Sequence, residues 1–570
     1  HAAGKKGAEF SGTGKEVSRW PEGLGMAATF DPELMKQFAS VIAKEYRALG
    51  ISQALGPQID LCTEPRWMRL EDTMGAQVDM VTAFTKAYCD GLQTTEGTPD
   101  GWGKDSVAAM VKHWPGGGTG ESGRDAHYAY GKYAVYPGGR FEEHMRPFTE
   151  GAFRLEDGTG KAAAVMPYYT VCWEQDTKYG ENVGNSYSRY IIDDLLRKRE
   201  GYDGVVCTDW GITDDPLGPV GGFGTRAHGV EHLGEAERYL KILSNGVDMF
   251  GGCSRKDPVL QAYALGCKEY GESVMRKRME QSAARILTLM FRVGLFENPY
   301  LDPRESAAIV GAREYVEAGL AAQRRSVVLL KNKESVLPLK KGAKIYVPGR
   351  HLDAHYTFFR TMQPALDVQP LGSRDTEGYF TLVDSPAEAD AAVVFAESPL
   401  CDCYTQEDLD KGGSGYLPIT LQYRPYRAEA AREHSLAKGD FRENDCDRTY
   451  INKENTPYNA SDLDNILSAR QAMGDKPVIV VLQLHNPAVV AEFEGQTDGL
   501  IAHFGVENRV LMEVLSGEVS PGGRLPMLLP ASMETVERHC EDVADDMDAY
   551  VDSCGNRYDY GFGLTDYAQG

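Results

Sequence analysis

The sequence contains no hydrophobic run of the length that a membrane-spanning helix requires. Such a helix needs about 18 consecutive apolar residues, and even the stretch 477–490 is interrupted by Gln483, His485, Asn486 and Pro487. The start at His1 also lacks the charged segment and apolar core of a secretory signal. We therefore expect no membrane partner; a periplasmic or secreted location stays open if a signal peptide precedes His1.

Positive charge and metal-binding patterns are also scarce. The formal net charge is −24, which argues against nucleic acid as a partner and favours a neutral or cationic ligand. The eleven cysteines show no CxxC spacing, and the close pair Cys401 and Cys403 has no neighbouring histidine or further cysteine. A metal site or a disulfide framework would need such neighbours. We expect no metal and no cofactor.

The first 300 residues alternate short apolar strands with amphipathic helices. Strands are predicted at 51–60, 107–114, 162–168, 204–209 and 246–250, and helices at 31–49, 78–92, 188–198, 235–244 and 275–296. This alternation predicts a parallel sheet in an α/β domain. Residues 301–315 are predicted to be a linker, and residues 316–570 a second α/β domain.

The second domain is predicted from a helix at 316–324 and apolar strands at 326–332, 345–347, 391–395, 478–482 and 500–504. A further helix is predicted at 461–473, with Ser461 placed to cap it. Residues 423–457 are polar and have no periodicity, which indicates an insertion at the rim of this domain.

Candidate chemical groups follow the strands of the first domain. Asp209 follows the strand residues 205–207 and Thr208, at the strand end where α/β barrels carry their active sites. It could equally cap the next helix. Glu64, Arg66 and Trp67 gather in a turn after another strand, where a structural ion pair is the alternative to a binding role. All six tryptophans fall within the first 210 residues, which favours stacking against sugar rings.

Taken together, motifs along the chain resemble glycoside hydrolase family 3, the β-glucosidase and exo-β-glucanase group. They are Pro65-Arg66-Trp67, Lys112-His113, Val165-Met166, Gly204 to Trp210, Gly246-Val247-Asp248, Gly294-Leu295-Phe296, Val328 to Asn332, Gly523 to Pro526 and Tyr560 to Leu564. The resemblance implies a TIM-like (β/α) barrel followed by an α/β sandwich, with the active site between them. It also implies a carbohydrate substrate and a retaining mechanism in which Asp209 is the nucleophile.

Retaining hydrolysis also needs an acid/base group. In this family it commonly comes from the sandwich domain, shortly before a Leu-Pro or Ile-Pro pair. Glu407 stands eleven residues before Pro418, so we predict Glu407 as the acid/base, with Glu397 in reserve. The alternative is an Asp125–His127 dyad, because residues 112–127 resemble the N-acetylglucosaminidase branch. That match has a longer loop, a Gly in place of the usual His, and Ala126 in place of Ser or Thr.

The remaining roles follow from the resemblance. Lys112 and His113 are expected to donate to sugar hydroxyls, Tyr168 and Trp210 to wall the sugar, and Arg66 to hold neighbouring carboxylates. Met166 is also expected to bind the substrate. Glu64 replaces the usual Asp as an acceptor for two hydroxyls, with a side chain longer by about 1.5 Å.

Only five barrel strands are visible, whereas family barrels begin further upstream. We expect an N-terminally incomplete barrel, completed by a missing upstream segment or another chain; a degenerate barrel is the alternative. The sequence also leaves a homo-oligomer open. The favoured function is an exo-acting retaining β-glucosidase that hydrolyses terminal non-reducing β-D-glucosyl residues. The alternatives are a β-N-acetylglucosaminidase and a non-catalytic sugar-binding relative.

Overall fold

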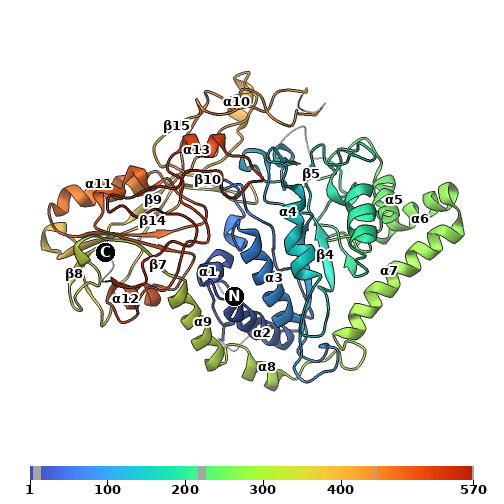
Figure 1. Cartoon of the computed structure of the whole chain (residues 1–570), viewed down its shortest axis with the longest axis horizontal. Coiled ribbons are helices and arrows are strands. Elements are labelled where there is room, and N and C mark those ends of the chain that lie inside the picture. Colours follow the sequence, from blue (N-terminus) through green and yellow to red (C-terminus); the bar gives the residue numbers. More distant parts are fainter. Residues whose placement is uncertain (4–14, 216–225, 441–442, 444, 568–570) are drawn as a thin grey trace.

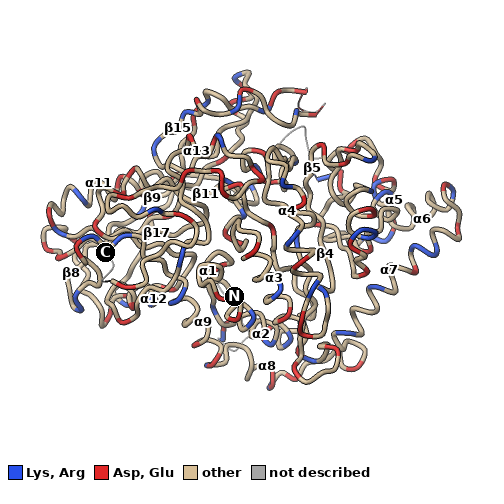
Figure 2. Tube along the Cα trace, in the orientation of Figure 1, with Lys and Arg blue, Asp and Glu red and all other residues tan. Residues whose placement is uncertain are grey.

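The protein folds into two lobes that follow one another along the chain (Figure 1). The computed structural model describes residues 1–3, 15–215, 226–440, 443 and 445–567. In Figure 1 the first lobe contains α2, α3 and β4, and the second contains β7, β8 and β14. Acidic and basic residues are distributed over both lobes (Figure 2).

The first lobe is built on a parallel sheet in the order β1-β2-β4-β6. Single bridges add Gln58, beside Lys112, and Met249, beside Cys207. These positions match all five predicted strands, and nearly every strand residue is buried, as in parallel sheets covered on both faces. The sheet forms part of a barrel-like α/β lobe, with the strands β1 Gln53–Ala54, β2 Ala108–Trp114, β4 Ala164–Pro167 and β6 Val205–Val206.

Helices surround this sheet where the apolar spacing predicts them. Asp31 caps α2, its carboxylate accepting from the Leu34 N–H at 3.1 Å. The helix predicted at 188–198 is present as a π-helix, η6, and α6 is an additional helix. The bounds are α1 Gly23–Ala28, α2 Pro32–Ala48, α3 Val78–Gln93, α4 Phe141–Arg146, η4 Pro147–Ala152, η6 Tyr190–Arg199, α5 Glu235–Asn245, α6 Lys256–Tyr270 and α7 Glu272–Arg292.

The second lobe contains a six-stranded sheet in the order β13-β8-β14-β17-β18-β7. Only the β18–β7 pair is antiparallel. All five strands predicted for this domain are present. The bounds are β7 Val328–Asn332, β8 Lys344–Tyr346, β13 Thr381–Val383, β14 Ala391–Glu397, β17 Val478–Gln483 and β18 Gly499–His503, with the helices α9 Arg313–Ser326, α10 Gln406–Asp410, α11 Ser461–Met473, α12 Asn508–Leu515 and α13 Met533–Arg538.

Two local predictions need correction. The residues expected to be a linker contain the helix α8 Pro303–Ile309, which Asp302 caps by accepting from the Arg304 N–H at 2.8 Å. The Asp-Pro pair is itself a helix-start signal. Ser461 does not cap α11: Ala460 is the N-cap residue, and the Ser461 hydroxyl donates instead to the His351 carbonyl at 2.5 Å.

Short antiparallel pairs and turns border the sheets. The polar segment 423–457 carries one such pair, β15 with β16, and it also buries Tyr450 and Arg448, so it is more than a rim insertion. The pairs are β9 Arg350–Leu352 with β12 Leu366–Val368, β10 His355–Tyr356 with β11 Met362–Gln363, and β15 Tyr426–Arg427 with β16 Glu454–Asn455; β3 Tyr133–Ala134 and β5 Val171–Cys172 form a parallel pair.

Among the described residues, no helix is both long enough and apolar enough to span a bilayer. In the same residues no three His, Cys, Asp or Glu side chains gather in an arrangement that could hold a metal ion. The eleven cysteines are free thiols.

Candidate active site

Asp209 lies at the carboxyl end of β6 with its two oxygens in different situations. The Trp210 N–H donates to Oδ1 at 2.7 Å. Oδ2 is buried and has no hydrogen-bond partner among the described residues, and Nε2 of His113 lies 3.7 Å from it. The residue is 7% exposed. One oxygen is therefore held in place while the other is available for chemistry.

His113 is held beside Asp209 as a neutral imidazole. Its Nδ1 lies 2.8 Å from Oδ2 of Asp60, and Oδ1 of Asp60 accepts from the backbone N–H groups of His113 and Gly117. Burial and the nearby Arg69 lower the pKa of His113 to about 4, against the pull of Asp60. With Nδ1–H donating to Asp60, Nε2 accepts from Arg69 at 3.2 Å.

Lys112 and Tyr169 complete the electrostatic surroundings of Asp209. Burial, followed by the positive charge of Arg69, lowers the pKa of Lys112, while Asp209 acts in the opposite direction. Burial and then the Asp209 carboxylate raise the pKa of Tyr169 far above its ordinary value. The Tyr169 hydroxyl donates to the Trp210 carbonyl at 2.8 Å. The charge on Asp209 therefore raises the pKa of both side chains, although burial outweighs this effect at Lys112.

Asp125, which is buried, and His127, which is partly exposed, form a dyad close to this group. Oδ1 of Asp125 lies 2.7 Å from Nδ1 of His127 and accepts from the His127 backbone N–H at 2.9 Å. Oδ2 accepts from the Trp67 indole at 2.8 Å and from the Tyr168 hydroxyl at 3.0 Å. Although burial acts against it, His127 holds the pKa of the Asp125 carboxyl well below its ordinary value. The dyad is thus a fixed carboxylate that orients an imidazole.

Ring contacts connect the dyad to the Asp209 group. The ring centroids of His127 and Tyr169 are 4.9 Å apart, and those of Tyr168 and His113 are 4.3 Å apart. Tyr168 thereby bridges Asp125 and His113. The structure brings together Lys112, His113, Tyr168, Trp210, Asp125 and His127 of the predicted residues around Asp209.

Glu64 and Met166 occupy positions that do not suit the predicted contact with sugar. Glu64 is fully buried, and its two oxygens accept from Nε and a terminal nitrogen of Arg66, each at 2.8 Å. Glu64 and Arg66 therefore form the structural ion pair that was the alternative to a binding role. A terminal nitrogen of Arg66 also donates to the Glu537 carboxylate at 3.1 Å. Met166 is 1% exposed and packs in an apolar cluster with Ala164.

The two predicted glutamate acid/base residues lie in other surroundings. Glu407 is on α10 with a side chain that is 77% exposed, and its ion-pair partner among the described residues is Lys411. Glu397 ends β14 and pairs with Arg350 and with His485, the latter at 3.4 Å. Despite burial, these two cations lower the pKa of Glu397 to about 2. Glu397 is therefore an ionised partner in a charge cluster.

The tryptophans serve mainly as core residues. Trp20, Trp67 and Trp114 are at most 1% exposed, whereas Trp210 is 41% exposed. Of these four, Trp210 is the one with a substantially exposed ring. The three buried tryptophans are therefore not available for stacking on a sugar, and stacking by Trp210 stays a prediction.

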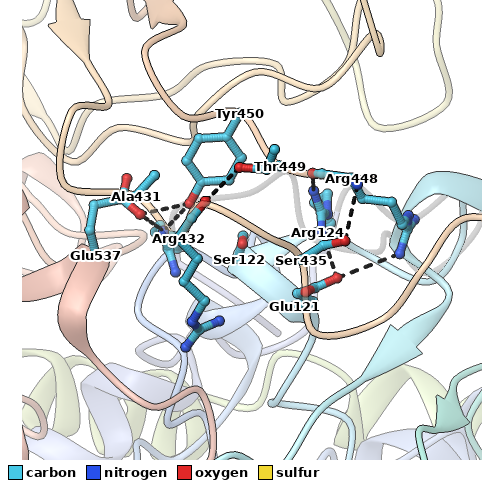
Figure 3. A pocket seen from close by; sticks show the side chains of 11 residues that line it. Glu121, Ser122, Arg124, Ala431, Arg432, Ser435, Arg448, Thr449, Tyr450 and Glu537 are labelled. Carbon is cyan, nitrogen blue, oxygen red and sulfur yellow. Dashed lines mark hydrogen bonds and ion pairs between the residues drawn. The ribbon is translucent and has the colours of Figure 1, made fainter. Parts of the chain in front are cut away.

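A buried charge cluster fixes the loop that carries the dyad (Figure 3). Arg124 donates to Glu121 at 2.9 Å and to the Arg448 carbonyl at 3.1 Å. Arg448 donates in turn to the Tyr130 carbonyl, and Glu121 accepts from the Leu436 N–H. Segment 423–457 of the second lobe thus holds the loop on both sides of Asp125 and His127.

Several residues of the site were not predicted from the sequence. Asp60 ends a predicted strand, a position that is itself a signal for a site residue. Arg69 follows Trp67 by two residues in the same turn. Arg448 lies in a polar segment without periodicity, and nothing local distinguishes it from its neighbours.

The chain matches two family descriptions that together cover most of its length. "Glycosyl hydrolase family 3 N terminal domain" matches residues 8–289, and "Glycosyl hydrolase family 3 C-terminal domain" matches residues 327–566. "Probable beta-glucosidase C" of Aspergillus flavus is 35% identical over 94% of this chain and 73% of that protein. "Periplasmic beta-glucosidase/beta-xylosidase" of Dickeya chrysanthemi is 32% identical over 96% of this chain and 73% of that protein.

Solved structures share the fold at lower identity. A β-glucosidase from Erythrobacter marinus has a TM-score of 0.67 at 21% identity, covering 97% of this chain and 70% of that chain. A β-glucosidase from Listeria innocua, solved with isofagomine, has a TM-score of 0.66 at 20% identity. The match covers 91% of this chain but only 65% of that one, slightly under two thirds of its length.

Proposed function

The chain belongs to glycosyl hydrolase family 3, and we propose that it is a β-glucosidase that releases terminal β-D-glucosyl residues with retention of configuration. The observation that carries this proposal is Asp209 at the strand end, with Oδ1 held by Trp210 and Oδ2 unpartnered among the described residues. The names of the curated relatives support glucose as the sugar. They do not favour the N-acetylglucosaminidase or the non-catalytic alternative.

Asp209 is proposed as the nucleophile. Its Oδ2 attacks the anomeric carbon, the bond from that carbon to the glycosidic oxygen breaks, and the departing oxygen takes a proton from the acid. Water then attacks the anomeric carbon of the covalent intermediate, loses a proton to the same group, and releases Asp209. Two inversions at one carbon give overall retention.

We propose His127, oriented by Asp125, as the acid and base. An imidazole can give and take a proton near neutral pH, and a buried carboxylate partner stabilises the protonated form. The 2.7 Å contact leaves Nε2 as the group that exchanges the proton. Glu407 is less suitable because its exposed side chain pairs with Lys411. Glu397 is less suitable because a carboxylate with a pKa near 2 has no proton to give.

The groups around Asp209 are proposed to bind the glucosyl ring. Lys112 supplies a cationic donor, and Trp210 supplies an exposed ring face. Asp60 orients the His113 ring, while burial and Arg69 keep His113 neutral, so no positive charge on His113 neutralises the nucleophile. Arg66 and Glu64 support the turn beneath Trp67.

Azide rescue tests both assignments at once, because the anomer of the product reports which group was removed. Asp209→Ala should lose at least about 1000-fold in kcat on an aryl β-glucoside, since the covalent route is lost. Azide should then restore turnover and give the α-glucosyl azide. His127→Ala should keep the nucleophile, hydrolyse activated aryl glucosides better than alkyl glucosides, and give the β-glucosyl azide.

Asp203→Ala is a suitable control, because Asp203 precedes the same strand but its side chain is 76% exposed. It should retain wild-type activity. Unchanged turnover by a folded Asp209→Ala variant would refute the proposed nucleophile. A β-glucosyl azide from Glu407→Ala, but not from His127→Ala, would refute the proposed acid/base. Aryl β-xyloside and N-acetylglucosaminide, assayed in parallel, test the sugar.

A further inference from the structure

The loop that follows β17 joins the second lobe to the turn that carries Trp67. β14 and β17 are parallel neighbours, so the residues that follow them leave the same edge of the sheet. There the Ser398 hydroxyl accepts from the backbone N–H groups of His485 at 3.0 Å and of Asn486 at 3.2 Å. The loop is therefore fixed on its own lobe at the point where it meets the first lobe.

Asn486 contacts the first lobe through its side-chain amide. Its Nδ2 donates to the carbonyls of Pro65 and Trp67, each at 2.8 Å. Beside it, Nδ1 of His485 lies 2.5 Å from the Glu71 carboxylate. Asn486 is 5% exposed and Trp67 is 1% exposed, and hydrogen bonds that are shielded from water are electrostatically stronger than bonds in water. The second lobe thus holds the main chain of this turn.

The Trp67 indole extends this contact to the dyad. Its N–H donates to Oδ2 of Asp125 at 2.8 Å, and Oδ1 of Asp125 lies 2.7 Å from Nδ1 of His127. A hydrogen bond to an ionised acceptor is about twice as strong as one between neutral groups. Tyr168 donates to the same Oδ2 at 3.0 Å, so the carboxylate keeps one donor when the indole is removed. The path from Asn486 to His127 runs through Trp67 and Asp125.

We propose that Trp67 and Asn486 are positioning residues for the acid/base group. The proposal rests on the proposed β-glucosidase activity, with His127 as its acid. Trp67 fixes the plane of the Asp125 carboxylate, and Asn486 fixes Trp67, so the imidazole meets the glycosidic oxygen in one orientation. The second lobe thereby contributes to proton transfer without supplying the acid itself.

The dependence on the leaving group distinguishes this role from a merely structural one. Dinitrophenolate leaves without taking up a proton, whereas methoxide must take one up, so the methyl glucoside depends on the acid. General acid catalysis contributes about 10²–10⁴-fold. Trp67→Phe should therefore lower kcat/KM for methyl β-glucoside by about tenfold or more, though less than His127→Ala does, and leave the dinitrophenyl glucoside within about twofold.

Asn486→Ala should act in the same direction with a smaller effect, lowering kcat/KM for methyl β-glucoside by about threefold, because the indole itself remains. If Asn486 acts through Trp67, the double variant Trp67→Phe/Asn486→Ala should lose no more than Trp67→Phe alone. The ratio of kcat/KM for the two glucosides does not depend on the fraction of folded enzyme, so a loss of stability does not change it.

Trp20→Phe is the matched control. Trp20 is as fully buried as Trp67, and its indole donates to the Ser18 hydroxyl at 2.9 Å, but it packs in a different apolar cluster. The control variant therefore loses the same buried N–H group away from the dyad. Its ratio of kcat/KM for the two glucosides should stay at the wild-type value.

The outcomes separate the proposed activity from the positioning role. If the wild type hydrolyses neither glucoside, the proposed function is wrong. If His127→Ala loses activity equally on both glucosides, the proposed acid is wrong and the positioning role fails with it. If His127→Ala loses the methyl glucoside selectively but Trp67→Phe behaves like Trp20→Phe or lowers both substrates equally, the positioning role alone is overturned. Losses from Trp67→Phe and Asn486→Ala that multiply in the double variant would overturn the path through Trp67.

Discussion

Replacing Arg448 by methionine tests whether the second lobe positions the dyad loop. The Arg448 side chain is completely buried. It donates to the Tyr416 hydroxyl at 2.9 Å, to Glu443 at 3.2 Å and to the Tyr130 carbonyl. Removing one partner of a buried ion pair costs about 3–5 kcal/mol, because the other charge stays uncompensated. Glu443 keeps Lys132, 3.2 Å away, so we expect about 3 kcal/mol of lost unfolding free energy.

The same substitution should affect catalysis through the loop. Because the Tyr130 carbonyl loses its donor three residues after His127, kcat should fall more than KM rises. Denaturant unfolding and steady-state kinetics on an alkyl β-glucoside measure the two effects. Arg427→Met is the control, since that side chain is 58% exposed, and it should change the unfolding free energy by no more than about 0.5 kcal/mol.

A double variant checks the cause of the loss. Glu443→Gln together with Arg448→Met removes the uncompensated charge, so the pair should be less destabilised than the sum of the single variants by about 1–2 kcal/mol. Additive effects, or a loss below about 1 kcal/mol for Arg448→Met alone, would contradict the reasoning.

Two further predictions concern charged groups of the second lobe. His485 lies between Glu71 and Glu397, which overcome its burial and raise its pKa to about 10 from 6.5. Its contribution to stability should therefore be complete below pH 6.5 and lost as the pH rises towards 10. His485→Gln should accordingly be less stable than wild type at pH 6. The difference between their denaturation midpoints should shrink as the pH rises towards 10, and a difference that stays constant with pH would contradict this prediction. Glu407→Gln should leave kcat/KM on aryl and alkyl glucosides within about twofold, because an exposed i,i+4 pair with Lys411 contributes little, and a hundredfold loss would restore Glu407 as the acid.

Much of the fold was predictable because local spacing determines it. Leu34 and Ile42 recur at helical spacing after Asp31, and α2 forms there with Asp31 as its cap. The buried strands of both sheets follow from apolar runs such as Val478–Gln483. Ser461 shows the limit: its hydroxyl donates to His351, a residue 110 positions away, and no local pattern reveals that contact.

The site was predictable only in part, for a related reason. Asp209, Lys112 and His113 each end a strand, so the topology alone brings them together. The roles of the carboxylates depend on their partners. Glu64 is occupied by Arg66, and Glu397 by Arg350 and His485. The spacing of Glu407 from Leu417-Pro418 predicts it as the acid/base, but that spacing does not determine where the side chains of α10 point.

Covalent trapping tests the central claim most directly. Incubation with an activated 2-deoxy-2-fluoro-β-glucoside should inactivate the enzyme and add one fluoroglucosyl group to the intact protein, because the fluorine slows release of the intermediate. Mass spectrometry of the digest should then place the label on Asp209. A label on a different carboxylate, or continued turnover with no label, would contradict the account.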